Sequence, residues 1–467
     1  MPIDIPPLGA RSVVWIVAEL HLLLAAFILG APIFVVVCEW LGQRTGDARY
    51  ERLAKETMKA VTIAYSLTAI AGAAFLILLV GPYQRFTGQL MVLFAPVFGL
   101  YAALIFLENL LMYVYWYSWK PLARHKGWHI TIGLALNVTG TVVMLLMNAV
   151  GSFMLTPPES AQTASLWEAI NNASWSGLNL HRFIANITFG GFVVALFAAI
   201  MFLTARTDED RAFYDWMGFT GNFIGVATVM ALPLAGYVLA KELFVYDATI
   251  ATFMMADKLS GFFVMQGLLV SLTFLGANYY MWQSIQRIEG GPRFLPVMRT
   301  SFAVMIVATA VWITPQNFLP DLTSPPPPGV SLAQVAIPER AAFIGLMMAK
   351  ALAVTATILF TFLTYMLYRR ALGTGRVVWG RISTRAQYAL VFVPAVAVYT
   401  MALMGAIREL ARQDWHVYRV VRDTTPYWYT PSLGYTTAMT GVVTLLFFLL
   451  MAFIFWIGFK LEARGDA

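Results

Sequence analysis

Long apolar blocks recur along the whole chain and constrain its fold more than any other feature. A helix needs roughly 20 consecutive apolar residues to cross the hydrocarbon core of a bilayer. About eleven blocks reach that length, and we expect helices near residues 12–40, 56–82, 88–118, 130–153, 179–205, 213–238, 256–287, 297–317, 339–368, 384–408 and 433–460. The sequence therefore predicts an all-α fold, a polytopic transmembrane helical bundle.

The composition supports this fold class. Hydrophobic residues make up 60% of the 467 residues and charged residues only 12%, whereas an ordinary soluble domain is about 25% charged. A soluble chain of this length would split into several domains joined by polar linkers, and no such linkers are evident. We therefore expect a single membrane domain over 1–467. Its first six helices fall in 1–240, two more in 241–338 and the last three in 339–467.

The formal net charge of +7 does not indicate a nucleic-acid partner, because the placement of the basic residues indicates membrane topology instead. The basic residues sit in short clusters between the apolar blocks and form no continuous stripe. Examples are Arg44, Arg49, Arg52 and Lys55, and then Arg369, Arg370, Arg376 and Arg381. The positive-inside rule places such loops in the cytoplasm, which predicts an N-terminus outside and a cytoplasmic C-terminus. The uncharged or acidic segments 154–178 and 318–338, the second with Pro325–Pro328, are then outer loops.

Several site classes have no support in the sequence. Cys38 is the single cysteine, so disulfides and cysteine-ligated zinc or iron–sulfur sites within the chain are excluded. There is no CxxCH sequence for covalent haem attachment, and no Walker, GxSxG or HExxH motif. ATP hydrolysis and the common hydrolase reactions are therefore not indicated.

Ionisable residues at membrane depth are costly and usually face the protein interior, so they are functional candidates. The sequence places seven there: Glu19, His21, Glu39, Glu108, His181, Lys350 and Glu409. With the predicted topology, His21 and His181 lie near the outer starts of their helices. Met347 and Met348 fall in the outer third of another helix, and Glu409 lies at the outer end of a fourth. Four helices thus bring these side chains to one outer layer.

Histidine, methionine and carboxylate are ligands that haem iron accepts, and a His/Met pair gives a low-spin electron-transfer haem. Facing helices of a bundle can hold both faces of the macrocycle. Each signal alone has a structural alternative. An intramembrane histidine can be a hydrogen-bonded packing residue, and Glu409 can be a salt-bridged helix end between Arg408 and Arg412. The convergence of these residue types on one side favours haem.

A local motif resembles a known family. Residues 409–415 read Glu-Leu-Ala-Arg-Gln-Asp-Trp, which is similar to the ExGRQPW signature of the large subunit of cytochrome bd quinol oxidases, with Ala411 for glycine and Asp414 for proline. Further agreement comes from the spacing of Arg11, His21, Gly30 and Glu39, from His181 with Gly190, and from Glu108 in a Phe-Leu-Glu sequence. The resemblance covers helices 1–6 and the last three helices.

The resemblance implies a set of haem ligands. His21 would ligate the haem at which oxygen reacts, which is haem d or haem b. His181 together with Met348, or less favourably Met347, would ligate the low-spin haem b that takes electrons from quinol. Glu409 would ligate the high-spin haem b. The implied cofactors are two or three haem b groups, haem d as the alternative at one site, and quinol as an electron donor.

The same resemblance implies roles for neighbouring residues. Arg412 and Trp415 would lie close to the high-spin haem. Arg11 and Arg412 would pair with haem propionates, a charge-assisted contact that suits guanidinium. Glu108 would belong to the proton route, so His21 and Glu108 are the residues expected to take part in catalysis.

Two departures from the family pattern bear on oxygen and quinol. The family usually has a second carboxylate eight residues before the helix-3 glutamate, where this chain has Leu100. It also has a long hydrophilic quinol-binding loop, where this chain has the apolar segments 256–287 and 297–317. These segments are too long and apolar for a surface loop, and we expect them to be membrane helices.

The leading hypothesis is a haem-containing oxidoreductase of the bd type in the bacterial cytoplasmic membrane. It would carry electrons from quinol or from a cytochrome donor such as cytochrome c to dioxygen. One alternative is a bd-like electron-transfer subunit of a larger respiratory complex that does not reduce oxygen. Another class of function is an ion-coupled transporter. The expected partners are a second membrane subunit of the bd type or other respiratory-complex subunits.

Overall fold

The computed structural model describes residues 9–159, 161–255, 257–319, 336–423 and 432–460. In these ranges the chain is almost entirely helical, and eleven helices are long and apolar enough to cross a membrane. Both the all-α fold and the number of crossings predicted from the sequence are therefore confirmed. The proline run predicted for an outer loop lies outside the described residues.

The chain divides into two compact units. One consists of residues 1–190 and 408–467, and the other of residues 191–407. The boundaries fall inside α7 (Trp175–Thr204) and α14 (Thr384–Ala411). The expected single domain over 1–467, with its sections 1–240, 241–338 and 339–467, stays a prediction.

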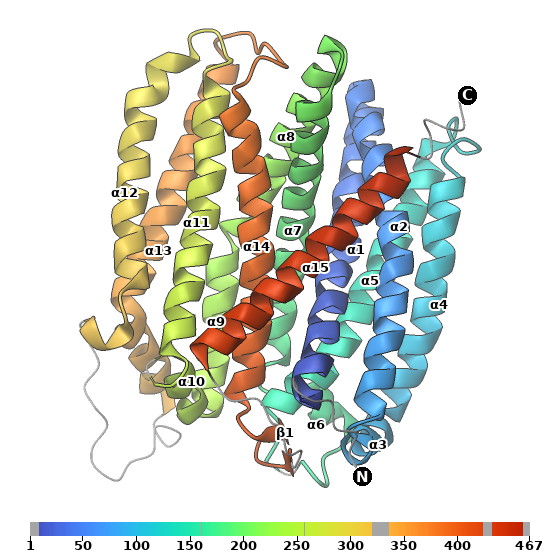
Figure 1. The fold of residues 1–467 in the computed structure, drawn as a ribbon, viewed down its shortest axis with the longest axis vertical. Coiled ribbons are helices and arrows are strands. Elements are labelled where there is room, and N and C mark those ends of the chain that lie inside the picture. The colour runs from blue at the N-terminus through green and yellow to red at the C-terminus, as the bar shows by residue number, and fades with distance from the viewer. Residues whose placement is uncertain (1–8, 160, 256, 320–335, 424–431, 461–467) are drawn as a thin grey trace. The chain divides into compact units, whose positions relative to one another are not determined.

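The first unit is built mainly around α1. Its other elements are α2 (Ala48–Val80), α3 (Gln84–Leu93), α4 (Ala95–Tyr117), α5 (Lys126–Leu155), α6 (Leu166–Ile170), β1 (Trp415–Val417), β2 (Val421–Arg422) and α15 (Leu433–Lys460). α1 (Ala10–Thr45) packs against α2, α5 and α15, and α4 packs against α5. Figure 1 shows α15 crossing α1 and α2 at a slant. α1 is buried along most of its length, as its near-continuous apolar sequence predicts.

Two glycines allow α1 and the first half of α7 to touch backbone to backbone. A Cβ atom at Gly30 would lie 1.8 Å from the Asn186 carbonyl oxygen, and one at Gly190 would lie 2.8 Å from the Ala31 nitrogen. No larger residue fits at either position, because real Cβ atoms do not approach that closely. This contact fixes the position of α7 along the axis of α1, and therefore also the position of the helical turn of α7 that carries His181.

Two helix boundaries differ from the expected ones for local reasons. The predicted helix 88–118 is two helices, α3 and α4, that meet at Phe94. Pro96 sits in the first turn of α4, where a proline is tolerated, but its missing N–H and its ring prevent α3 from continuing through it as one helix. The chain that follows α14 forms the β1–β2 hairpin, and Gln413 and Arg419 adopt left-handed backbone with φ near 54° and 56°.

The second unit contains α8 (Asp208–Val229), α9 (Leu232–Tyr246), α10 (Ala248–Met255), α11 (Ser260–Ile285), η1 (Gly291–Phe294), α12 (Leu295–Ile313), η2 (Gln316–Phe318) and α13 (Ala336–Leu372). α11, α12 and α13 pack against one another. α11 and α12 meet the length and hydropathy of membrane spans, so the helices predicted over 256–317 are confirmed. A buried ion pair between Arg287 and Asp215 ties the α11 end to α8.

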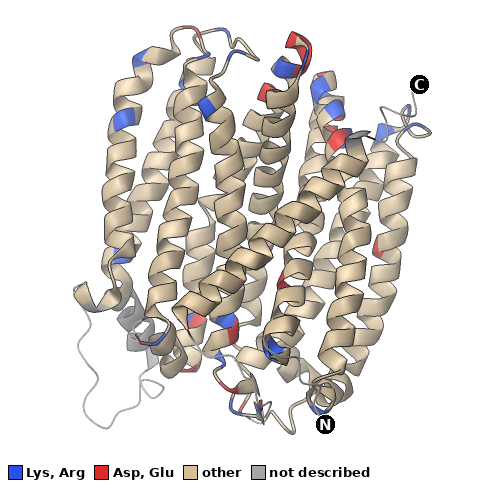
Figure 2. Cartoon of the chain, viewed as in Figure 1, with Lys and Arg blue, Asp and Glu red and all other residues tan. Residues whose placement is uncertain are grey.

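Charge is concentrated at the helix ends in both units. Figure 2 shows Lys, Arg, Asp and Glu mostly at the ends of the long helices, with few charged residues along the spans. The isolated acidic positions along the spans include Glu108, whose side chain is buried. This pattern is that of a multi-pass membrane protein.

Candidate functional site

A buried ion-pair network joins the start of α1 to the end of α14. Arg11 Nε donates to Glu409 Oε1 at 2.7 Å and Arg11 Nη2 donates to the Glu409 carbonyl at 3.1 Å. Arg412 pairs with the other carboxylate oxygen of Glu409. The Arg11 and Arg412 side chains are each 5% exposed and that of Glu409 is 19% exposed. Two guanidinium groups therefore hold this carboxylate in its ionised form.

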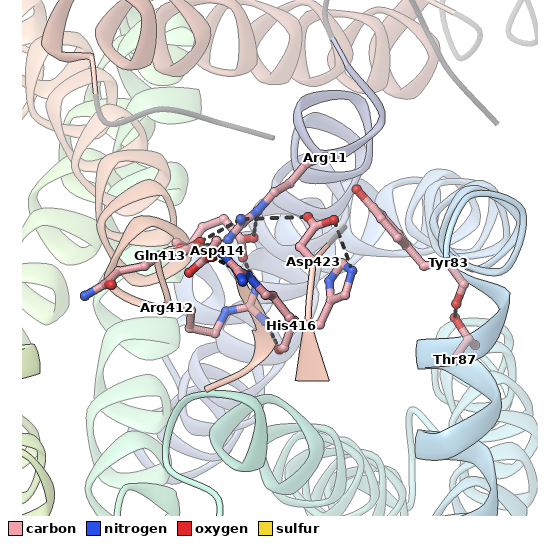
Figure 3. A network of polar contacts seen from close by, with 10 residues as sticks. Arg11, Tyr83, Thr87, Arg412, Gln413, Asp414, His416 and Asp423 are labelled. Carbon is pink, nitrogen blue, oxygen red and sulfur yellow. Dashed lines mark hydrogen bonds and ion pairs between the residues drawn. The ribbon is translucent and has the colours of Figure 1, made fainter. Parts of the chain in front are cut away.

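The β1–β2 hairpin closes over this network (Figure 3). Arg11 Nη1 donates to the Gln413 carbonyl at 2.7 Å and lies 3.8 Å from Asp423 Oδ2. Asp423 Oδ1 lies 3.5 Å from His416 Nε2, and the His416 carbonyl accepts from Arg412. The left-handed backbone at Gln413 turns the chain out of α14 so that the hairpin can fold back.

His416 is the histidine of the hairpin, and its side chain is largely buried. Its ring is 4.5 Å from the Tyr83 ring and 4.7 Å from the Phe86 ring, measured between centroids. Burial lowers the pKa of His416 to about 4, although the Asp423 carboxylate opposes that shift. Near neutral pH the imidazole is therefore uncharged. Asp423 and His416 were not singled out from the sequence, because they lie in a stretch that reads as an outer loop.

Two more arginines face the interior of the first unit. Arg182 Nη1 donates to Asn148 Oδ1 at 2.9 Å, and Arg408 Nη2 donates to the Gly151 carbonyl. Neither guanidinium lies within 4.0 Å of a carboxylate of the described residues, although the charges of both act on Glu19. Two half-buried cations thus contact only neutral acceptors, an arrangement that suits an anionic group from outside the chain.

The His21 ring is held by a contact to the backbone of α2. Its Nδ1 lies 3.1 Å from the Thr68 carbonyl oxygen. A carbonyl can only accept, so Nδ1 carries the proton and Nε2 keeps its lone pair. Ligating histidines commonly use such a bond to fix ring and tautomer. The ring lies against Gly72, where a Cβ would be 2.8 Å from Cε1, so this glycine leaves room for the imidazole.

The remaining predicted residues are placed as follows. His181 is in α7, and its Nδ1 is buried with no hydrogen-bond partner among the described residues. Met347 and Met348 are half-buried residues of α13 in the second unit.

Glu108 is buried in α4 and faces Gly140 of α5, where a Cβ would lie 2.7 Å from Glu108 Oε1. Trp415 begins β1, and its backbone N–H donates to the Arg412 carbonyl at 3.1 Å.

A second polar cluster lies near the far end of α1. Glu39, from the intramembrane list, accepts hydrogen bonds or shares protons with His129, Tyr115 and Lys126. His129 was missed from the sequence because it falls at the predicted start of its helix, and hydropathy does not reveal its partner 90 residues away.

Comparison with known proteins decides the family. Residues 10–257, more than half of the chain, match the family described as cytochrome bd terminal oxidase subunit I. The chain belongs to this family. The fold agrees over nearly the full length with the structure of bd oxidase from Geobacillus thermodenitrificans, with a TM-score of 0.59, 15% identity and coverage of 97% of this chain and 98% of that chain. No curated protein sequence matches.

Family membership makes this chain a membrane respiratory oxidoreductase of a family whose members work with membrane partner subunits. The donor set fits haem on two observations. His21 presents an unbonded Nε2 from a fixed ring, and Arg182 and Arg408 supply positive charge without a carboxylate partner in the described chain. Glu409 also fits, because each oxygen of an ion-paired carboxylate retains a second lone pair for a metal.

Proposed function

We propose that the chain is the haem-carrying subunit of a bd-type oxidase in the bacterial cytoplasmic membrane. It would pass electrons from quinol or a cytochrome donor such as cytochrome c to dioxygen. The observation that carries the proposal is the His21 geometry, with Nδ1–H bonded to the Thr68 carbonyl and Nε2 left for iron. The positive-inside distribution of Lys and Arg supports an N-terminus outside, which puts His21 in the outer half of the membrane.

The chain's own residues would divide the work. His21, His181 and Glu409 would hold iron, and Met348 or Met347 would supply a further ligand. Arg182 and Arg408 would bind propionates, and Arg11 and Arg412 would keep Glu409 ionised and correctly placed. Trp415 would close the site at the hairpin. Two or three haem b groups, one replaceable by haem d, would supply the one-electron chemistry when bound.

Glu108 would hold the proton destined for the reacting centre. Its carboxyl group is buried among α1, α4 and α5, beside Gly140 and Leu29. A buried carboxyl without a fixed cationic partner can change protonation state at modest cost, unlike one paired with arginine. Its proton would come from the cytoplasmic side, as the predicted topology implies.

A reduced-minus-oxidised visible spectrum of the purified protein tests the proposal. We expect a Soret band and haem b bands in the wild type, and a reduced haem content in His21→Ala. His125→Ala is the matched control, since His125 is an exposed residue just before α5. Absence of a Soret band in freshly purified wild type would reject the haem assignment. Equal spectra for the two variants would reject His21 as a ligand.

A second candidate is an electron-transfer subunit that does not reduce oxygen. It is favoured by Leu100, a 49% exposed apolar residue of α4, and by α11 and α12, which form spans where the family has a quinol loop. Oxygen consumption by haem-loaded protein with a reduced quinol or cytochrome c separates the two. Consumption with either donor supports the oxidase, and haem reduction without consumption supports the electron-transfer subunit.

A further inference from the structure

Five polar side chains form a cluster around Glu39. Glu39 Oε1 lies 2.6 Å from His129 Nδ1, and Glu39 Oε2 accepts from the Tyr115 hydroxyl at 2.7 Å. Lys126 Nζ lies 3.5 Å from Glu39 Oε1 and 2.6 Å from Glu51 Oε1. All five belong to the first unit, on α1, α2, α4 and α5.

The hydrogen-bond pattern fixes how many protons Glu39 and His129 hold. His129 Nε2 lies 2.9 Å from the Tyr115 carbonyl oxygen, so Nε2 carries a hydrogen. Nδ1 faces a carboxylate oxygen at 2.6 Å, and two lone pairs cannot face each other at that distance, so one further proton lies between them. The pair therefore shares a single proton, carried by the imidazole or by the carboxyl group.

The exposure of the side chains falls steadily from Glu51, at the surface, to the buried Glu39–His129 pair. The exposed fraction of the side chain is 48% for Glu51, 16% for Lys126, 1% for Glu39 and 0% for His129. The His129 ring is stacked on Tyr115, with centroids 4.3 Å apart, and meets the Trp119 ring edge at 4.7 Å. The stacked Tyr115 ring face tolerates a charged imidazole. Cys38, the residue before Glu39 in α1, is also buried.

The same seam leads to Glu108. Tyr115 and Glu108 are seven residues apart on α4, which is two turns, or about 10 Å, along one face. Gly133 and Gly140 are likewise seven apart on α5. A Cβ at Gly133 would lie 2.9 Å from the Tyr115 ring, as one at Gly140 would lie 2.7 Å from Glu108 Oε1. Both acidic positions therefore border the one α1–α4–α5 seam.

Polar atoms lie midway along the seam. Asn137 of α5, between Gly133 and Gly140, donates from Nδ2 to the Pro32 carbonyl of α1 at 3.2 Å. Pro32 has no N–H and lies inside α1, so the Ile28 carbonyl lacks its helical donor and can bind water. Water at Asn137 and Ile28 could span the distance between the two carboxyl groups.

We propose that Glu39 and His129 share one proton and form the entry group of a proton route that runs between α1, α4 and α5 to Glu108. The pair gives its proton inward and regains one from water at Lys126 and Glu51, so its proton count is unchanged over each cycle. This inference rests on the proposed oxidase function for its purpose, because oxygen reduction consumes protons. The proton sharing itself does not depend on haem.

The first arm of the test needs no haem. In [15N]histidine-labelled protein, the shared proton gives either a doubly protonated His129 ring by solid-state NMR or a protonated carboxyl band by infrared spectroscopy. The substitution Glu39→Gln removes the carboxyl group that shares the proton, so it should abolish the signal that the wild type shows, whether from the imidazole or from the carboxyl group. His129→Gln identifies the ring among the five histidines. Absence of both signals in the wild type overturns the inference.

The second arm measures proton uptake with a pH-indicator dye after stepwise reduction of protein in vesicles. Glu39→Gln and His129→Gln should each slow uptake by about a hundredfold, the lower end of the range for a positioned proton-transfer group, with wild-type haem spectra. Glu56→Gln, whose half-buried carboxylate pairs with Arg52 on α2, should leave it unchanged. Tyr115→Phe keeps the ring packing and serves where the other variants do not fold.

The outcomes separate the two proposals. Uptake at the wild-type rate in the folded variants overturns the entry route and leaves the oxidase assignment intact. Wild-type protein without haem rejects the oxidase assignment, and the first arm still decides whether the pair shares a proton.

Discussion

Two carboxylates near opposite ends of α1 are held by different kinds of partner. Glu409 contacts the guanidinium groups of Arg11 and Arg412, which keep their protons at any ordinary pH. Glu39 contacts His129, Tyr115 and Lys126, whose protons can exchange. The charges at the Glu409 site are therefore fixed, whereas the Glu39 site can carry a proton.

The difference suits two tasks of one membrane oxidoreductase. Fixed guanidinium charge can position an anionic cofactor and keep a ligand carboxylate ionised. A carboxylate paired with imidazole can pass a proton onward, because neither form of the pair leaves a buried charge without a partner. Arg11 and Glu39 are 28 residues apart on α1, or about 40 Å of helix, so the two sites can be altered independently.

Glu409→Gln should have the largest effect. The substitution leaves Arg11 and Arg412 buried without their carboxylate, which costs about 3–5 kcal/mol when a buried pair is broken. If Glu409 ligates iron, the high-spin haem is lost as well. Haem content, the high-spin spectrum and thermal unfolding of the purified variant measure both effects.

Arg422→Gln is the matched control for that experiment. Arg422 pairs with Asp414 at 2.7 Å in the same hairpin, but its side chain is 67% exposed. Loss of such a surface pair costs about 0–1 kcal/mol. Wild-type haem content and spectrum in Glu409→Gln would assign Glu409 a structural role only and remove the contrast with Glu39.

His181→Ala should remove the low-spin haem spectrum and leave the other haem signals. His181 Nδ1 has no protein partner in the described chain, so the loss breaks no hydrogen bond and should change stability less than Glu409→Gln does. Visible and electron paramagnetic resonance spectra check the result. In Met347→Ala and Met348→Ala only one variant should show the same loss, because neighbours on a helix point about 100° apart.

The fold could be predicted because hydropathy and helix length respond to the same physical demand, that every backbone polar group be satisfied in lipid. His21 and Glu409 could also be singled out, since an ionisable side chain at membrane depth stands out locally, and Arg11 could be named from the spacing of the family pattern. Their partners could not. Arg11 and Glu409 are 398 residues apart, and no local pattern reveals which guanidinium meets which carboxylate.

The missed residues are missed for local reasons. His129 lies at a predicted helix edge, where a histidine reads as a solvated group, yet it is completely buried. His416 and Asp423 lie in a segment that reads as an outer loop, and only the left-handed turns at Gln413 and Arg419 fold it back over α14.

Acid should destabilise the Arg11–Glu409 end before it changes any ion pair. His416 is neutral in the folded protein with a pKa of about 4, below its ordinary value of 6.5. The unfolded chain therefore takes up the proton first, so stability is complete above pH 6.5 and falls as the pH drops toward 4. Unfolding midpoints between these pH values should show this slope, and His416→Gln should flatten it. An equal slope in both proteins would place the acid sensitivity elsewhere.

Tyr115→Phe should have the smallest effect and sharpens the comparison at the Glu39 end. The phenyl ring keeps the stacking on His129, and only the hydrogen bond from the hydroxyl to Glu39 Oε2 is lost. Such a bond to a charged acceptor contributes about 1.5–3 kcal/mol, but Lys126 and His129 still contact the carboxylate, so we expect a loss near the lower value. Because Glu39 loses a donor, the shared proton should move toward the carboxyl group, which infrared spectroscopy can detect. A loss of stability as large as that of Glu409→Gln would mean that Glu39, too, is a fixed structural charge.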